Sequence, residues 1–308
     1  MIFFDPQLII LLQSLLPYVT YEILNLFGDP IIYVVLLGLA YWCLSKRGGK
    51  IAVMLFMFSS FINIILKYGF GMPRPPVDLR QNPEYVMDQS YGFPSGATQV
   101  STTFWGWATI KLRKWWIALV GVFVILVTSI ARMGLGLHFL GDVIGGVIVG
   151  IIIVVWAYFL VPYLQPRWRH LPMFAQNWLL PAIALIFCFI FYTAFALGLP
   201  YFPSENVAVS MGLIFGFSIG ITAESRYVNF STNVPRNTKM FRALFGVIIA
   251  LAVYYSITAA FAFIPLIPLL HFITQFIKYI LIGFFGAFII PVIFNFIEQR
   301  KVFATKNS

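Results

Sequence analysis

The chain has 308 residues, of which 61% are hydrophobic and 10% are charged, and its formal net charge is +10. Soluble domains carry roughly a quarter charged residues, so this composition excludes a soluble globular protein and indicates a polytopic membrane protein. The positive charge does not imply nucleic acid as a partner, because Lys and Arg accumulate in the cytoplasmic loops of membrane proteins. Cys43 and Cys188 lie in apolar runs and predict no disulfide framework.

Residues 1–29 are apolar but interrupted, and they carry Asp5 before the first apolar run. Without a basic n-region, they are not expected to be a cleavable signal peptide. Because Gln13, Pro17 and Glu22 break the apolar pattern, we expect two short helices at the exoplasmic membrane interface. A full membrane span over the same residues is the alternative.

Nine apolar stretches follow, most of them close to the roughly 20 residues that a helix needs to cross a membrane. They cover residues 30–44, 51–66, 97–111, 115–131, 138–164, 178–198, 206–222, 242–264 and 272–297. Residues 68–94 contain too many prolines and glycines for a helix in lipid. The predicted fold class is therefore all-α, a transmembrane helical bundle of about nine spans.

Basic residues are distributed unevenly over the loops between these stretches. Of the 20 Lys and Arg residues, 15 lie in the loops 45–50, 111–114, 165–171 and 223–242 and in the tail. By the positive-inside rule this side is cytoplasmic, so the C-terminus lies inside and the loop 68–94 lies outside, in a periplasm or lumen. The compact chain with its short loops suggests a bacterial inner membrane.

This topology divides the chain into four parts. We expect exoplasmic interfacial helices over 1–29, a core of membrane helices over 30–175, additional membrane helices over 176–298 and a cytoplasmic tail over 299–308. Glycines at four-residue spacing, as in Gly212, Gly216 and Gly220, predict close helix packing inside the bundle.

A first polar island begins at the end of the second span. There Lys67 precedes a turn rich in glycine and proline that contains Arg74. Pro73 and Pro75 restrict the backbone on both sides of this arginine, which favours a fixed, ligand-binding guanidinium. A lysine that snorkels to the interface and a solvated loop arginine are the alternative.

A second island, Pro94-Ser95-Gly96, opens the span that begins at Ala97. The unpaired N–H groups of a first helical turn and the helix dipole together form a site for an anion. Ser95 taken alone is explained equally well as the N-cap of this helix.

The third island contains Arg132, His138 and Asp142. His138 and Asp142 are four residues apart, so on a helix they share one face, and the carboxylate can leave one ring nitrogen free to attack phosphorus. Arg132 suits bidentate binding of phosphate oxygens. Each residue also has a structural explanation, as an acid attracted to a helix N-terminus or an arginine at a helix end. Because all three islands share one face, they predict a site that binds and transfers a phosphoryl group.

The three islands together resemble the signature of the type 2 phosphatidic acid phosphatase (PAP2) superfamily, in its integral-membrane lipid phosphatase branch. That signature reads Lys-x6-Arg-Pro, then Pro-Ser-Gly-His, then Ser-Arg-x5-His-x3-Asp. The resemblance covers residues 67–142, but Ala97 stands where the family has histidine and Ala131 where it has serine.

The resemblance implies that His138 forms a phosphohistidine and that Asp142 orients it. The phosphate would be held by Lys67, Arg74, Ser95, the Gly96 backbone and Arg132. It implies neither a metal nor another cofactor, and cationic side chains can offset the charge of the phosphate. The chain carries no carboxylate cluster suited to Mg²⁺.

Ala97 puts turnover in doubt, because alanine neither donates nor accepts a proton. General acid–base catalysis contributes about 10²–10⁴-fold, so the chain as written is expected to hydrolyse its substrate slowly. One explanation is an engineered His→Ala change, which the otherwise intact site favours. The other is a natural pseudo-enzyme that binds lipid phosphate without turning it over.

The expected substrate is a phosphate or pyrophosphate on a hydrophobic tail, such as a polyprenyl phosphate, a phospholipid or a sphingoid phosphate. Membrane lipids are the other expected partners, and the oligomeric state stays open. A transporter or flippase is the alternative from a different functional class. Lys278 inside the last span is its main indication.

Overall fold

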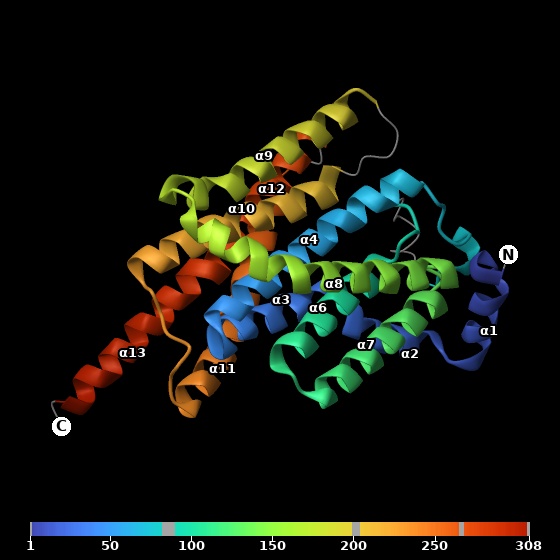
Figure 1. Cartoon of the computed structure of the whole chain (residues 1–308). Coiled ribbons are helices and arrows are strands. Elements are labelled where there is room, and N and C mark those ends of the chain that lie inside the picture. The colour runs from blue at the N-terminus through green and yellow to red at the C-terminus, as the bar shows by residue number, and fades with distance from the viewer. Residues whose placement is uncertain (1, 82–89, 199–203, 265–267, 307–308) are drawn as a thin grey trace. The chain divides into compact units, whose positions relative to one another are not determined.

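The computed structural model describes residues 2–81, 90–198, 204–264 and 268–306 (Figure 1). Within these ranges the chain is helical and contains no strand. It divides into two compact units. Unit 1 comprises Met1–Val34 and Ala52–Gln165, and unit 2 comprises Val35–Ile51 and Pro166–Ser308.

Unit 1 contains two short N-terminal helices and most of the membrane helices around the polar islands. Its main helices are α1 (Gln7–Leu15), α2 (Tyr18–Asn25), the first half of α3 (Pro30–Leu39), most of α4 (Lys46–Phe70), α6 (Gly96–Leu112), α7 (Trp115–Gly134) and most of α8 (Leu140–His170). Short 3-10 turns cover Leu26–Gly28 and Val77–Leu79.

Unit 2 contains the remaining helices. They are α9 (Met173–Ala196), α10 (Ser204–Tyr227), α11 (Arg236–Phe261), α12 (Pro268–Phe284) and α13 (Ile290–Lys306). Two single π-helical turns, Ala40–Leu44 and Phe285–Ile289, also belong to this unit. Within it α10 packs against both α9 and α12 (Figure 1).

Eight helical stretches in the described ranges are long and apolar enough to cross a membrane. They are Tyr18–Leu44, Lys46–Phe70, Trp115–Gly134, Leu140–Trp168, Phe174–Ala194, Asn206–Tyr227, Arg236–Phe261 and Leu269–Glu298. The predicted all-α membrane bundle is confirmed. The remaining predicted span is α6, which has 17 residues and many buried hydroxyl and amide side chains.

The N-terminal segment forms two short helices, as predicted, and the chain breaks between them at Leu16 and Pro17. Both helices pack against α7. Gln13 holds this arrangement, because its Nε2 donates to Leu79 O at 2.8 Å and to Gly134 O at 3.0 Å. The first stretch of membrane length begins at Tyr18, well before the expected start at Pro30.

Glycines allow close approach between helices in both units. In unit 1, a Cβ added at Gly150 of α8 would lie 2.6 Å from Thr102 Cβ of α6. In unit 2, a Cβ added at Gly216 of α10 would lie only 2.0 Å from Ile280 O of α12. The prediction that these glycines serve packing inside the bundle is confirmed.

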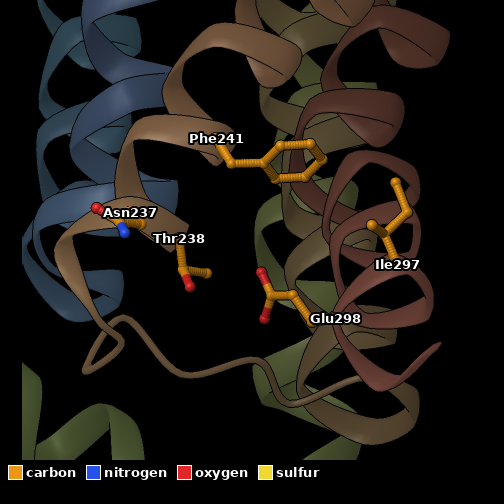
Figure 2. Close-up of a pocket in the computed structure, with 5 residues that line it drawn as sticks. All are labelled: Asn237, Thr238, Phe241, Ile297 and Glu298. Atoms are coloured by element: carbon orange, nitrogen blue, oxygen red, sulfur yellow. The ribbon is translucent and has the colours of Figure 1, made fainter. Parts of the chain in front are cut away.

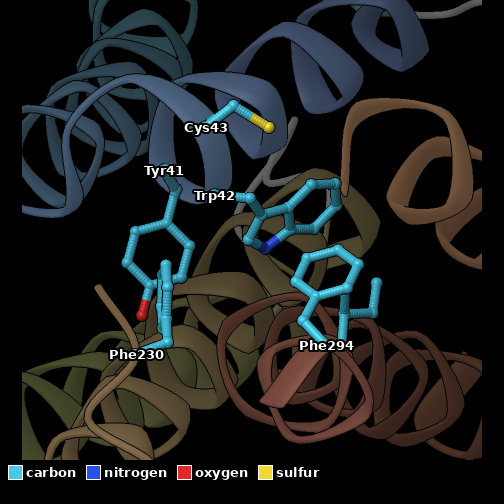
Figure 3. Packing of buried hydrophobic residues seen from close by; sticks show 6 residues of the cluster. Tyr41, Trp42, Cys43, Phe230 and Phe294 are labelled. Carbon is cyan, nitrogen blue, oxygen red and sulfur yellow. The ribbon is translucent and has the colours of Figure 1, made fainter. Parts of the chain in front are cut away.

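The core of unit 2 is an aromatic cluster at the end of the first π-helical turn (Figure 3). Its buried members are Tyr41, Trp42, Cys43, Phe230, Ile290 and Phe294. Two ion pairs, each with one buried partner, border it: the buried Glu224 Oε1 lies 2.7 Å from Lys46 Nζ, and the buried Arg242 Nε lies 2.7 Å from Glu298 Oε1. These charges are paired within unit 2, as burial in an apolar environment requires.

Candidate active site

Lys67 lies in the last turn of α4 and is buried, with 8% of its surface exposed. Its ammonium group donates a hydrogen bond to the carbonyl oxygen of Tyr91. The bond ties the end of α4 to the segment that leads into α6. The lysine is therefore held inside unit 1 rather than extended to an interface.

Arg74, in the first island, bonds to Ser90 on one side and to the third island on the other. Its Nε donates to Ser90 O at 2.8 Å and its Nη2 to Ser90 Oγ at 2.8 Å. On the other side, Nη1 donates to Leu137 O at 3.0 Å and lies 3.4 Å from His138 Nε2. These contacts fix the plane of the guanidinium against the histidine.

Ser95 occupies the N-cap position of α6, yet its side chain does not bond to the helix backbone. Its fully buried hydroxyl lies 3.1 Å from Thr98 Oγ1, and its N–H donates to Asp142 O at 2.9 Å. The second and third islands are thus joined by a backbone hydrogen bond. The helix itself begins at Gly96, one residue before the predicted start.

His138 lies just before α8 rather than on it, because the helix begins at Leu140. The expectation that His138 and Asp142 share a helix face is wrong in this detail. The reason is a capping bond. Asp142, in the first turn, accepts a hydrogen bond from Phe139 N at 2.9 Å, and this bond makes Phe139 the N-cap, so that the helix begins after it. The pair still meets, with His138 Nδ1 3.4 Å from Asp142 Oδ2.

Two contacts of the His138 ring assign the hydrogen of its neutral form, and the ring also has a hydrogen bond with the Gly92 backbone that favours its charged form. A guanidinium only donates, so Nε2 accepts from Arg74 and carries a lone pair. Nδ1 then carries the hydrogen and donates it to the Asp142 carboxylate. In this tautomer Nε2 carries the lone pair of the ring, and the Asp142 carboxylate faces the protonated Nδ1.

Burial holds the pKa of His138 well below its usual value, and the positive charges of Arg74, Lys67 and Arg132 lower it further. The ring is 3% exposed. A neutral imidazole at pH 7 is the form that can attack phosphorus. The same cations that lower its pKa form the charge that an incoming phosphate would meet.

Local backbone geometry brings the islands together. Gly92 N donates to Met72 O at 2.9 Å, which closes the first island onto the segment before α6. At the turn between α7 and α8, Gly136 has φ +73°, and a Cβ there would lie 2.1 Å from Leu79 O. Only glycine fits this close approach, which seats the turn before His138 against the loop after Arg74.

Ala97 is the second residue of α6 and is half-buried. Ser101 Oγ donates to its carbonyl at 2.6 Å, and a Cβ added at Gly28 would lie 3.4 Å from its Cβ. Neither of these neighbours carries a group that titrates near pH 7. Neither residue could therefore supply the acid that the resemblance leads one to expect at this position.

Sequence reasoning missed residues that support the predicted ones. Ser90 binds Arg74 with both its carbonyl and its hydroxyl, and nothing in its sequence context marked it. Asn63 and Gln99 form a buried pair beside the second island. Asn63 could have been found, because it lies one helical turn before Lys67 in an otherwise apolar span.

Two other candidate features, Lys278 and a cavity, belong to unit 2. Lys278 of α12 lies over the ring of Tyr279, 4.9 Å from its centroid. In the ranges that the structure describes, no group of three or more His, Cys, Asp or Glu side chains is placed to hold a metal ion. Unit 2 has a cavity of about 260 Å³ (Figure 2), lined by Asn237, Thr238, Phe241, Ile297 and Glu298.

Comparison with protein families gives two matches. A model of the PAP2 superfamily matches residues 48–166, and a model of the PAP2 superfamily phosphatase transmembrane extension matches residues 208–301. The first range contains every predicted site residue, and the second covers most of α10 and all of α11 and α12. No curated protein and no solved structure matches the chain.

Proposed function

The chain belongs to the PAP2 superfamily, and we propose that it acts on a lipid phosphate through attack of His138 Nε2 on phosphorus. The observation that carries the proposal is the position of the His138 ring. Its Nδ1 faces the Asp142 carboxylate at 3.4 Å, and its Nε2 faces Arg74 at 3.4 Å among three cations.

The proposed reaction has two steps. In the first, the Nε2 lone pair forms a bond to phosphorus while the bond from phosphorus to the ester oxygen of the lipid breaks. The product is a phosphohistidine and a lipid alkoxide that takes a proton from water. In the second, water attacks the phosphohistidine, and inorganic phosphate leaves with His138 restored.

The cationic side chains stabilise the charge that develops in both steps. Lys67, Arg74 and Arg132 surround the histidine closely enough to lower its pKa, so a phosphate on Nε2 would lie in the same positive field. Gly96 opens α6, and the free N–H groups of this first turn would bind a further phosphate oxygen. Asp142 holds the hydrogen on Nδ1 during the attack.

Ala97 limits the first step, because the leaving alkoxide meets no protein acid at that position. We expect Ala97→His to raise phosphate release from a lipid phosphate at least about 100-fold, the lower end of general acid catalysis. Release is measured with purified protein in detergent on polyprenyl, phospholipid and sphingoid phosphates. His138→Ala in the Ala97→His background is the control and should abolish the gain.

Two results would contradict the proposal. One is a variant Ala97→His that is folded and as inactive as the parent on every lipid tested. The other is activity in Ala97→His that survives His138→Ala, because the nucleophile would then lie elsewhere.

A second candidate is favoured by Ala97 itself: a binding protein that holds a lipid phosphate without turnover. It predicts that the parental chain binds a short-chain lipid phosphate, that Arg74→Ala weakens this binding, and that Ala97→His leaves turnover absent. Restored turnover in Ala97→His favours the phosphatase.

A further inference from the structure

One face of α4 carries three buried polar side chains at four-residue spacing, Ser59, Asn63 and Lys67. Residues four apart on a helix lie above one another, separated by one turn of about 5.4 Å. Buried polar groups in a membrane helix are costly, so each needs a partner or a function. Lys67 belongs to the candidate site, but Ser59 and Asn63 are not explained by it.

The carboxamide of Asn63, on this face, is hydrogen-bonded to the carboxamide of Gln99 on α6. Asn63 Nδ2 donates to Pro94 O at 3.1 Å and to Gln99 Oε1 at 2.8 Å. Gln99 Nε2 donates to Ser59 O at 2.8 Å and to Ser59 Oγ at 3.2 Å. Ser59 Oγ also lies 3.0 Å from Thr103 Oγ1. Each amide nitrogen therefore makes two hydrogen bonds.

These bonds continue the contact that Lys67 makes. From the end of α4 inward, Lys67 bonds to Tyr91, Asn63 to Pro94 and Gln99, and Ser59 to Gln99. Successive turns of α4 thus bind the segment that leads into α6 and the start of α6 itself. A shift of α6 by one turn would leave the carboxamides unpaired in an apolar interior, where an unpaired polar group is strongly unfavourable.

The turn Pro94-Ser95-Gly96 is enclosed on two sides. A Cβ added at Gly96 would lie 2.9 Å from Asn63 Oδ1 on α4, and one added at Gly146 of α8 would lie 2.6 Å from Ser95 O. The turn has no room to move toward either helix. Its position therefore depends directly on the Asn63 carboxamide.

We propose that Asn63 and Gln99 are positioning residues, whose carboxamide pair fixes the turn Pro94-Ser95-Gly96 level with Lys67 so that both hold one phosphate. The proposal rests on the proposed function, because it takes the first turn of α6 and the Lys67 ammonium as phosphate ligands. Neither carboxamide touches the phosphate. Their effect is to keep the backbone N–H groups of α6 and the ammonium group within reach of the same oxygens.

The test measures the affinity of the purified full chain for inorganic phosphate by ³¹P NMR titration. Asn63→Leu removes both bonds at similar size and should weaken phosphate binding at least tenfold. Gln99→Asn shortens one amide and should weaken it too. Exchanging the amides in the double variant Asn63→Gln with Gln99→Asn keeps the combined length and should restore most of the affinity.

Matched controls come from the same two helices. Ser60 Oγ bonds to Phe56 O at 3.0 Å and Thr109 Oγ1 to Trp105 O at 2.9 Å, each within its own helix. Ser60→Ala and Thr109→Val should therefore leave phosphate affinity unchanged. In the Ala97→His background, Asn63→Leu should also raise KM at least tenfold.

A purely structural carboxamide pair would give a different pattern. In that case Asn63→Leu lowers the melting temperature while the folded protein binds phosphate as the parent does, and this result overturns the proposal but leaves the proposed function intact. If Asn63→Leu does not fold, the other two variants decide. Equal phosphate affinities of Gln99→Asn and of the double variant with exchanged amides would overturn the positioning proposal. A parental chain that binds no phosphate overturns both proposals together.

Discussion

The His138 ring lies between opposite charges that act on its two nitrogens differently. The Asp142 carboxylate faces Nδ1, and the Arg74 guanidinium faces Nε2. Burial and the nearby cations, Arg74 among them, disfavour the protonated ring, while the Asp142 carboxylate faces Nδ1. In the proposed function a bound phosphate would replace the ring as acceptor for Arg74, so the proposed nucleophile and the ligand would compete for one donor.

The pKa of His138 is a direct test of this arrangement. Because burial and three nearby cations disfavour the imidazolium, we expect its pKa in the folded protein to lie below the usual value of about 6.5. NMR titration of ¹³C-histidine-labelled protein in detergent measures it, with His138→Asn to assign the resonance. Arg74→Gln removes one cation and should raise the pKa.

The lowered pKa of His138 makes the stability of the folded chain depend on pH. The unfolded chain binds a proton at His138 at a higher pH than the folded chain, so the contribution of this residue to stability falls as pH drops below about 6.5. A His138 resonance that titrates above pH 6.5, or one that Arg74→Gln leaves unmoved, would contradict the account.

At the scale of helices, close packing depends on positions where no side chain fits. In unit 2, α10 meets α12 backbone to backbone at Gly216, where a Cβ would lie 2.0 Å from Ile280 O. Gly286, in the π-helical turn after α12, has no neighbour within 4 Å of an added Cβ. A side chain is therefore excluded at Gly216 but not at Gly286, although both glycines lie in the same unit.

This difference predicts opposite responses to one added methyl group. Gly216→Ala forces α10 and α12 apart and should lower the free energy of unfolding by about 1–3 kcal/mol, the usual cost of overpacking. Gly286→Ala meets no atom and should leave stability unchanged or slightly higher. Thermal unfolding of the two variants in the same detergent compares them, and equal melting temperatures would refute the packing role.

At the scale of the whole molecule, the family matches agree with the membrane-spanning helices of the structure. The chain is an integral membrane protein of the PAP2 superfamily, with one family model over the site and a second over a set of additional helices. We propose the topology that the basic loops indicate, with the site on the exoplasmic face and the C-terminus in the cytoplasm. A bacterial inner membrane and the four-part division of the chain remain predictions.

Cysteine labelling tests this topology. Cys43 and Cys188 are buried and would first be replaced by alanine. Asp78 and Lys114 are both exposed, one in the loop after Arg74 and the other between α6 and α7. In intact cells a membrane-impermeant maleimide should label Asp78→Cys at once and Lys114→Cys only after permeabilisation. The reverse pattern would place the site in the cytoplasm.

Much of this protein could be predicted from residues in sequence. A 61% hydrophobic chain with 10% charge has to bury its backbone polar groups in helices once it is in lipid, so the all-α bundle follows from composition. The islands at Lys67, Arg74 and His138 were identifiable because charged residues are costly in such a chain. Proline and glycine marked the loop that carries Arg74.

Other features depended on tertiary contacts that local patterns do not record. Asp142 accepts a hydrogen bond from Phe139 N, so α8 begins only at Leu140, after His138. The start of the helix therefore differs from the start of the apolar stretch in the sequence. Ser90 and Gln99 became partners of the site only when distant segments met. Hydropathy decides that a segment enters the membrane and that its backbone is helical, whatever its neighbours are. Which polar atoms then pair depends on the relative positions of helices, and only the folded packing of unit 1 determines those.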